Sequence, residues 1–487
     1  MKYTRSVAIN VVIANMIGTG VFTSLGYQVG SIPSWFSIMV LWSVGAVISL
    51  FGAFAYAEIS TRISGSGGEY NYLSKIYSNG LGFIAGWVSF IVGFSAPIAA
   101  VALAIDYYIS EPVYYFFFKY FGFLSEVVVI PEVLLEFIPK EKWIASIIIL
   151  MVGCIHILGI KSGSLFQNAI TRLKIVLIAA LILSPFLMVY FSDFNPSTIR
   201  FNPFNNGYND WDLIFSSEFA ISLVYVCFSY SGWNASVYFA SKIEDPVRNI
   251  PYSLIVGTLI VSFVYLLLNT AFLYSVEITQ LEGKLDIGNI LLESVFPKYA
   301  PILSLLFGVA LVASLSSMMI AGPSVLERMG EDYNILKIFN KSNKHQSPYI
   351  AIISLMILPI IMLHTASFEY IIKYIGVCLS LFSILVVLGV PILRARAGNS
   401  EKLDIYKAPF GNIISYLFSI INLWMIYHLV SSDIWILAGV SITLLSGFIL
   451  YKVITTIESD KKDVLSELIE QIITAILIIL FFIYLSL

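Results

Sequence analysis

The chain has 487 residues, of which 59% are hydrophobic and only 12% are charged, and its formal net charge is −3. A mean hydropathy of +0.89 excludes a soluble globular domain of this size, and the charge gives no reason to expect a nucleic-acid partner. The four histidines have no metal-binding spacing, and no nucleophile–base pair is evident. We therefore expect no enzyme, no metal and no cofactor.

Apolar runs of membrane-spanning length recur from one end of the chain to the other, which predicts an all-α polytopic membrane protein. In chain order the expected spans are 6–31, 35–60, 80–109, 142–160, 172–191, 213–241, 251–275, 300–322, 349–366, 370–392, 411–429 and 433–455. A thirteenth candidate at 465–486 is long enough to span but has an amphipathic start. We predict twelve membrane helices and leave the thirteenth open.

Lysine and arginine are concentrated in the alternate loops that share a side with the N-terminus, whereas the opposite loops carry more acidic residues. Basic loops face the cytoplasm in multi-pass proteins. The N-terminus is therefore expected in the cytoplasm. The expected location is the plasma membrane, which in a bacterium is the cytoplasmic membrane.

The first span contains an unusual stretch at residues 16–22, with the sequence MIGTGVF. Gly18 and Gly20 weaken a helix interior, and in lipid the freed backbone groups need other partners. A bound zwitterion fits such a break, because amides beyond it suit a carboxylate and carbonyls before it suit an ammonium. The alternative is that the glycines only allow another helix to approach closely.

The sixth span contains a second stretch of this kind at residues 227–234, with the sequence CFSYSGWN. Two serines, a glycine and an asparagine lie together where a hydrocarbon environment demands partners for them. A polar contact between helices is the alternative explanation for this span alone. Two breaks at corresponding places in the chain favour a common binding site.

The spans divide into two sets of five, each of which begins with a broken helix. An odd number of spans makes the second set enter the membrane from the opposite side, which is typical of an inverted repeat with its site at mid-membrane. The predicted units are a first five-helix repeat at 1–195, a second, inverted repeat at 213–392 and peripheral C-terminal helices at 411–487.

Five motifs together resemble the amino acid–polyamine–organocation superfamily of transporters, and most of all its L-type and bacterial amino acid permeases. They are IGTGVF at 17–22, GGEY at 67–70, FSYSGWN at 228–234 followed by EDPVRNIP at 244–251, Ser316-Ser317 with Arg328, Met329 and Asp332, and YKAPFG at 406–411. The resemblance covers residues 5–455. It implies the five-plus-five inverted-repeat (LeuT-like) fold.

The resemblance also implies roles for single residues. The amides of Gly18, Thr19 and Gly20, with the Thr19 hydroxyl, would receive the substrate carboxylate. The α-ammonium would bind carbonyls of Met16, Ile17, Phe228, Ser229 and Ser231. Phe228 would close over the substrate, and Asn234 would bridge the substrate or the broken helix.

Lys174 lies near the start of the fifth span. From the residues alone it is a lysine at the membrane edge, with its stem in lipid and its charge in water. The resemblance instead implies a fixed cation in place of a bound sodium ion, with Ser316 and Ser317 as its neighbours. A buried lysine also has the chemistry of a proton carrier, and the sequence does not decide between these two roles.

Glu58 ends the second span, and Glu69 lies in the loop that follows. One interpretation is that both are solvated carboxylates at the membrane interface. The other is that they form an inner gate through ion pairs with Arg62 or Arg248, with Glu58 as the main gate residue. The two interpretations have equal support from the sequence.

Together, the residues and the resemblance predict a sodium-independent exchanger of neutral L-amino acids that works by alternating access. Neutral substrates are favoured because no carboxylate lies in the central parts of the core spans. The alternatives are a proton-coupled symporter, with Lys174 or Glu58 as carrier, and a substrate-sensing receptor on the same scaffold. Light-chain exchangers of the family that this chain resembles carry a cysteine between spans three and four that tethers a partner subunit. The loop 110–141 contains no cysteine, so the resemblance implies no disulfide-linked heavy chain, and the protein would act as a monomer or weak homodimer.

Overall fold

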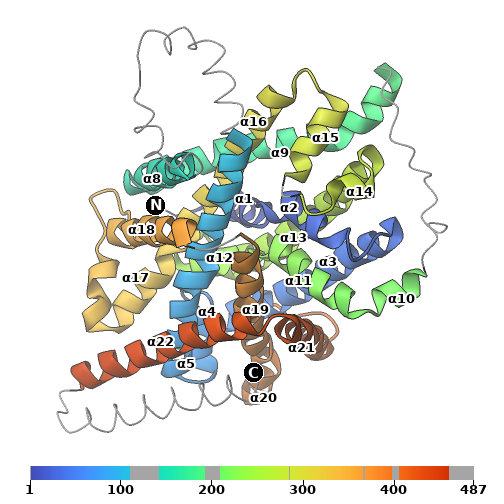
Figure 1. Cartoon of the computed structure of the whole chain (residues 1–487). Helices are drawn as coiled ribbons and strands as arrows, with labels where there is room; N and C mark the ends of the chain where they lie inside the picture. The colour runs from blue at the N-terminus through green and yellow to red at the C-terminus, as the bar shows by residue number, and fades with distance from the viewer. Residues whose placement is uncertain are drawn as a thin grey trace, which may run out of the picture.

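The computed structural model describes residues 2–109, 142–191, 209–284, 286–365, 368–397 and 405–459. Apart from one isolated bridge between Tyr3 and Ile243, the regular elements of these residues are all helices (Figure 1). The predicted all-α class is therefore confirmed.

The first half contains helices α1 (Arg5–Met16), α2 (Gly20–Gln28), α3 (Trp35–Arg62), α4 (Glu69–Ile76), α5 (Asn79–Val88), η1 (Ser89–Ser95), α8 (Trp143–Ile157) and α9 (Ile160–Phe191). Next come α10 (Asp210–Ile214), α11 (Ser217–Tyr230), α12 (Ala235–Tyr238), η2 (Ala240–Lys242), α13 (Pro246–Ser275), α14 (Ile278–Leu281), α15 (Ile287–Val295), α16 (Ala300–Ala321) and α17 (Pro323–Asp332). The last are η3 (Asn334–Asn340), α18 (Tyr349–Thr365), α19 (Phe368–Val387), α20 (Gly389–Ala397), α21 (Ile413–Ser432) and α22 (Ile434–Glu458).

Within the described residues, 9 helical segments are long and apolar enough to cross a membrane. The spans expected at 142–160, 213–241 and 349–366 are shorter apolar helices in the structure. The protein is thus a multi-pass membrane protein, whereas the number of twelve crossings stays a prediction. The thirteenth candidate, 465–486, lies outside the described residues.

The fifth span is longer than expected, because α9 begins at Ile160 and not near residue 172. Two of its early polar side chains form hydrogen bonds inside the protein. Gln167 Nε2 donates to Thr171 Oγ1 at 2.9 Å, and Asn10 Nδ2 donates to Asn168 Oδ1 at 3.0 Å. These bonds allow a polar stretch to continue the helix.

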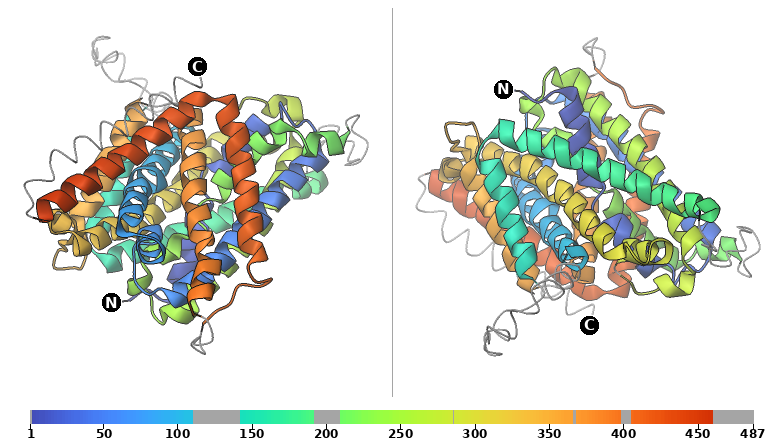
Figure 2. Two further views of the ribbon diagram at one scale, coloured as in Figure 1. Left: turned by 90° about the horizontal axis from the view of Figure 1, so that it is seen from below. Right: turned by 90° about the horizontal axis from the view of Figure 1, so that it is seen from above.

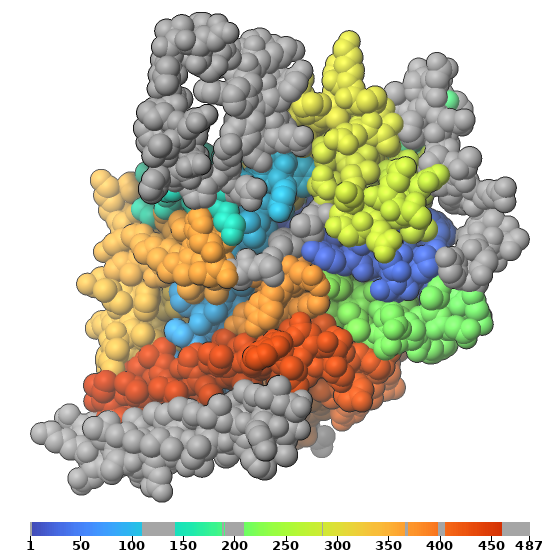
Figure 3. Space-filling view, in the orientation of Figure 1, coloured from blue at the N-terminus to red at the C-terminus, as the bar shows by residue number. Residues whose placement is uncertain are grey.

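Helix α1 lies inside the bundle, where it contacts α9, α13 and α16. Helices α3 and α13 pack along each other, and α19, α21 and α22 lie together at one side of the molecule (Figure 2). Of the nine candidate spans, α22 is the least buried, and Figure 3 shows it along one edge of the molecule.

The third span, Asn79–Ile109, changes its winding in the middle: residues Ser89–Ser95 form a π-helix. Ser95 Oγ donates to the carbonyl of Phe90 at 2.8 Å inside this segment. Before it, Trp87 Nε1 donates to Ser446 Oγ of α22 at 2.9 Å. Within it, Phe94 packs edge-on against Tyr238, with ring centroids 4.9 Å apart. π-Helical turns inside longer helices are frequent at functional sites.

Candidate functional site

The first predicted break is present. Helix α1 ends at Met16, and α2 begins at Gly20, with a non-helical connection between them. The Gly18 amide donates to the Met16 carbonyl at 2.7 Å, which turns the chain tightly. The first amides of α2 have no partner inside their own helix and carry its positive dipole end. The sequence prediction of a break at residues 16–20 is confirmed.

The second predicted break is present as well, between the end of α11 at Tyr230 and the start of α12 at Ala235. Gly232 has φ of 96°, which favours glycine. A Cβ on Gly232 would also lie only 3.0 Å from the backbone of Asn15 at the end of α1. The glycine thus serves both the turn and the close approach of the two broken helices.

The two breaks lie directly against each other. A Cβ on Gly20 would lie 2.6 Å from the Cα of Ser229, so only glycine allows α2 and α11 to pack at this distance. Ser229 Oγ donates to its own helix at Tyr225 and also pairs with Ser24 Oγ of α2 at 2.9 Å. Both interpretations of the glycines therefore apply, because they break the helix and allow close packing.

Tyr265 on α13 connects the two breaks, a role that the sequence did not reveal. Its hydroxyl lies 2.6 Å from the Met16 carbonyl and 2.8 Å from the Ser229 carbonyl. A hydroxyl has one hydrogen, so it satisfies one of these carbonyls at a time. The other keeps an open position for a second donor. A single tyrosine in an apolar span gives no pattern from which this could be read.

Lys174 is buried beside the first break, with 1% of its surface exposed. Its Nζ donates to the Ile17 carbonyl at 2.5 Å, to Ser314 Oγ at 2.6 Å and to the Ala14 carbonyl at 3.4 Å. The membrane-edge interpretation is wrong for this residue. Three oxygens hold the ammonium at the end of α1 as they would hold a bound cation.

The predicted neighbours of Lys174 need a correction. Ser316 pairs with His156 of α8 at 2.9 Å, and Ser317 donates to the carbonyl of Ser314 at 2.7 Å. The hydroxyl at the lysine is that of Ser314, which also donates to the Ile17 carbonyl at 2.7 Å. Ser316 lies two positions from Ser314 on the helix and therefore faces a different neighbour. Ser317 lies three positions from Ser314, but its hydroxyl is used by the Ser314 carbonyl.

A cavity of about 80 Å³, called the polar cavity from here on, lies beside the breaks, and its wall is about half polar and half apolar. This volume holds several water molecules or a small solute. Ser231, Gly232 and Asn234 line it from the second break, and Asn15 lines it from the end of α1. The predicted carboxylate site at residues 18–20 does not line the cavity in this conformation. A second cavity of about 370 Å³, between α9, α15 and α16, is almost entirely apolar and has none of the break residues in its wall.

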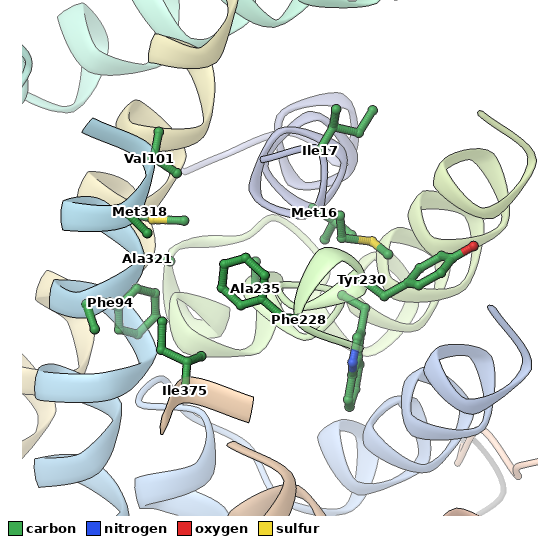
Figure 4. Packing of buried hydrophobic residues seen from close by; sticks show 14 of the residues in the cluster. Met16, Ile17, Phe94, Val101, Phe228, Tyr230, Ala235, Met318, Ala321 and Ile375 are labelled. Carbon is green, nitrogen blue, oxygen red and sulfur yellow. The ribbon is translucent and has the colours of Figure 1, made fainter. Parts of the chain in front are cut away.

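Bulky apolar side chains bound the region of the breaks (Figure 4). Phe94 and Met318 lie on neighbouring helices across from Met16 and Phe228. Phe228 is 7% exposed, and its carbonyl accepts the Ser231 amide at 2.9 Å. Of the carbonyls predicted to receive an ammonium, those of Met16, Ile17 and Phe228 already accept backbone amides or Lys174 within the protein.

Glu58 is fully buried and forms a dense charged cluster. Its carboxylate accepts from Arg62 at 2.8 and 3.0 Å, from Arg394 of α20 at 2.6 and 2.9 Å, and from the Ala408 amide at 2.8 Å. The predicted pair with Arg62 is confirmed, and Arg394 was not anticipated. Arg248 instead lies 3.9 Å from Asp245 in an exposed pair.

Glu69 differs from the prediction, since its carboxylate pairs with neither Arg62 nor Arg248. It accepts from the Tyr56 hydroxyl at 2.7 Å and from Asn234 Nδ2 at 3.3 Å. Asn234, predicted to touch the substrate or the broken helix, thus connects the second break to this acid. Glu69 also lines the polar cavity.

Comparison with known proteins gives a consistent result. The model of the amino acid permease family matches residues 5–478. The human b(0,+)-type amino acid transporter 1 is 24% identical over 447 residues, which are 91% of this chain and 85% of that protein. The rat large neutral amino acids transporter small subunit 2 is 24% identical over 431 residues, 88% of this chain and 75% of that protein. Mouse solute carrier family 7 member 12 is 25% identical over 417 residues, 83% of this chain and 82% of that protein.

Proposed function

This chain belongs to the amino acid permease family, and we propose that it is a sodium-independent exchanger of neutral L-amino acids. As a member of this family it is an amino acid transporter with several membrane helices, not an enzyme. The proposal adds the exchange mode, the independence from sodium and the neutral substrate class. It places the N-terminus in the cytoplasm of a cell whose plasma membrane holds the protein.

The observation that carries the proposal is the contact of two broken helices beside a polar cavity. The substrate carboxylate would bind the first amides of α2 and the Thr19 hydroxyl, a buried group without a hydrogen-bond partner among the described residues. The Tyr265 hydroxyl donates to either the Met16 or the Ser229 carbonyl. The α-ammonium would bind the other one of the two. The cavity stops short of residues 18–20, so the carboxylate reaches them only when the broken segments move apart, as in alternating access.

Lys174 supports independence from sodium. Its ammonium already provides a positive charge at the carbonyls where α1 ends, so a metal cation at the same oxygens would meet like-charge repulsion. The absence of a carboxylate from the central parts of the core spans continues to favour neutral substrates.

The test uses purified protein in liposomes that contain unlabelled alanine, serine and leucine, or none. Uptake of labelled amino acid should require the internal amino acid and should persist when choline replaces sodium outside. Accumulation in empty liposomes that needs a sodium gradient would contradict the proposal. Saturable binding with no flux would favour the receptor alternative.

Lys174→Met should lower the exchange rate about tenfold or more, because the Ile17 carbonyl loses a charged donor worth about 1.5–3 kcal/mol. The matched control is Lys161→Met, which removes an exposed lysine from the same helix and should leave exchange unchanged. Equal activity of the two variants would exclude Lys174 from the mechanism.

A further inference from the structure

Among the described residues that line the polar cavity, Glu69 is the one with an ionisable carboxylate. The residue is 1% exposed. Its Oε1 accepts the bonds from Tyr56 and Asn234, whereas Oε2 is buried and has no hydrogen-bond partner among the described residues. An acid with one open oxygen therefore lies in the wall of the candidate site.

The titratable groups that surround Glu69 are phenols, which are neutral. Tyr56 approaches from α3 and Tyr238 from α12, and Tyr72 follows on α4 itself and packs edge-on against Tyr56. None of them supplies a positive charge. The carboxylate of Glu69 thus receives hydrogen bonds but no counter-charge from these three elements.

The arginine that packs nearest to this turn is engaged elsewhere. A Cβ on Gly67 would lie 2.9 Å from Arg328 Cγ, so the arginine stem covers the loop before Glu69. Its guanidinium, however, bonds Glu331 at 2.6 Å and Asp332 at 3.1 Å. No ion pair joins Glu69 to any described cation.

An ionised carboxylate is costly in a closed, buried place without a cation. Burial raises the pKa of Glu69 from its usual 4.5 to about 7, and the hydrogen bond from Tyr56 lowers it by a smaller amount. Water that enters an opened cavity removes the burial, so the affinity for the proton falls when the cavity opens. The closed and open states therefore differ in how strongly Glu69 holds its proton.

We propose that Glu69 is a proton-binding site whose occupancy is coupled to closure of the cavity. In the closed state Glu69 is the neutral acid at any pH below about 7. When the cavity opens to the cytoplasm, the O–H bond breaks, the proton passes to water and the carboxylate remains. A neutral Glu69 in the closed state also agrees with a neutral substrate. The proposal rests on the proposed function for the substrate and for the side on which the cavity opens.

The experiment measures protons taken up when substrate closes the cavity. Purified protein in detergent is titrated with L-alanine and with L-leucine by calorimetry in two buffers of different ionisation enthalpy. The titration is made at about pH 6, which lies between the usual pKa of 4.5 for a glutamate and the pKa of about 7 in the closed state. The wild type should take up nearly one proton per protein on binding. This uptake is seen because the measured binding heat then depends on the ionisation enthalpy of the buffer. Glu69→Gln should bind the same amino acids with the same heat in both buffers. The control Glu244→Gln, which alters an exposed carboxylate, should behave as the wild type.

Tyr56→Phe keeps the test decisive if Glu69→Gln does not fold. It removes the bond that favours the charged acid, so the pH of half-maximal proton uptake should rise by about half a unit or more. Binding heat that is independent of buffer in the wild type would overturn the proposal, and so would proton uptake that survives in Glu69→Gln. The proposed function would stand in both cases. A wild type that binds no amino acid would instead reject the proposed function, and this proposal with it.

Discussion

Two glutamates close together in the chain, Glu58 and Glu69, are both buried, yet their surroundings differ completely. Two guanidinium groups and a backbone amide surround Glu58. Glu69 receives a phenol and a carboxamide and faces a cavity. Burial alone therefore does not tell what a carboxylate does. The charge of its neighbours decides whether it holds helices together or stays free to exchange a proton.

The largest effect is expected from Glu58→Gln. The change leaves Arg62 and Arg394 without their shared anion in a buried place, where removal of one partner costs about 3–5 kcal/mol. The apparent melting temperature in detergent should fall by many degrees. The control Asp245→Asn weakens an exposed pair with Arg248 and should cost less than about 1 kcal/mol. Similar losses in both variants would show that the Glu58 cluster does not hold the helices together.

A smaller effect that depends on pH is expected at Glu69. Its pKa in the folded protein, about 7, lies above the usual 4.5, so the folded state binds the proton more tightly than the unfolded state. The contribution of Glu69 to stability is complete below pH 4.5 and is lost as the pH rises through about 7. Glu69→Gln should lack this loss and should melt higher than the wild type above pH 7. If the melting temperatures of the two proteins change in parallel between pH 4.5 and 8, this prediction is wrong.

The smallest effect is expected from Arg394→Lys, which keeps the charge at Glu58 but removes the two-pronged contact. A lysine presents one compact charge in place of the planar guanidinium, so about 1 kcal/mol should be lost. The melting temperature should fall much less than in Glu58→Gln. The exposed Arg396 of the same helix provides the control, Arg396→Lys, with no expected change. A loss as large as that of Glu58→Gln would mean that geometry outweighs charge in this cluster.

The sequence predicted the all-helical class and both breaks, because hydropathy and glycine position act locally, whereas the number of twelve membrane helices stays a prediction. It placed Lys174 correctly beside the first break only through the family resemblance. It could not choose Ser314 over Ser316 and Ser317, since that choice depends on the rotation of α16 against α9. Tyr265 and Arg394 were missed because their partners lie far away in the chain. The inverted repeat and the division at 195, 213 and 411 stay predictions.

The π-helix of the third span has a consequence for any insertion or deletion. Each residue of an α-helix turns the chain by about 100°. One wide turn therefore sets the angular phase between Trp87, which faces α22, and Phe94, which faces the cavity. Removal of a single residue from 89–95 would restore regular winding but would rotate one half of the span against the other. The helix would still form, but either Trp87 would lose its contact with α22 or Phe94 would no longer line the cavity.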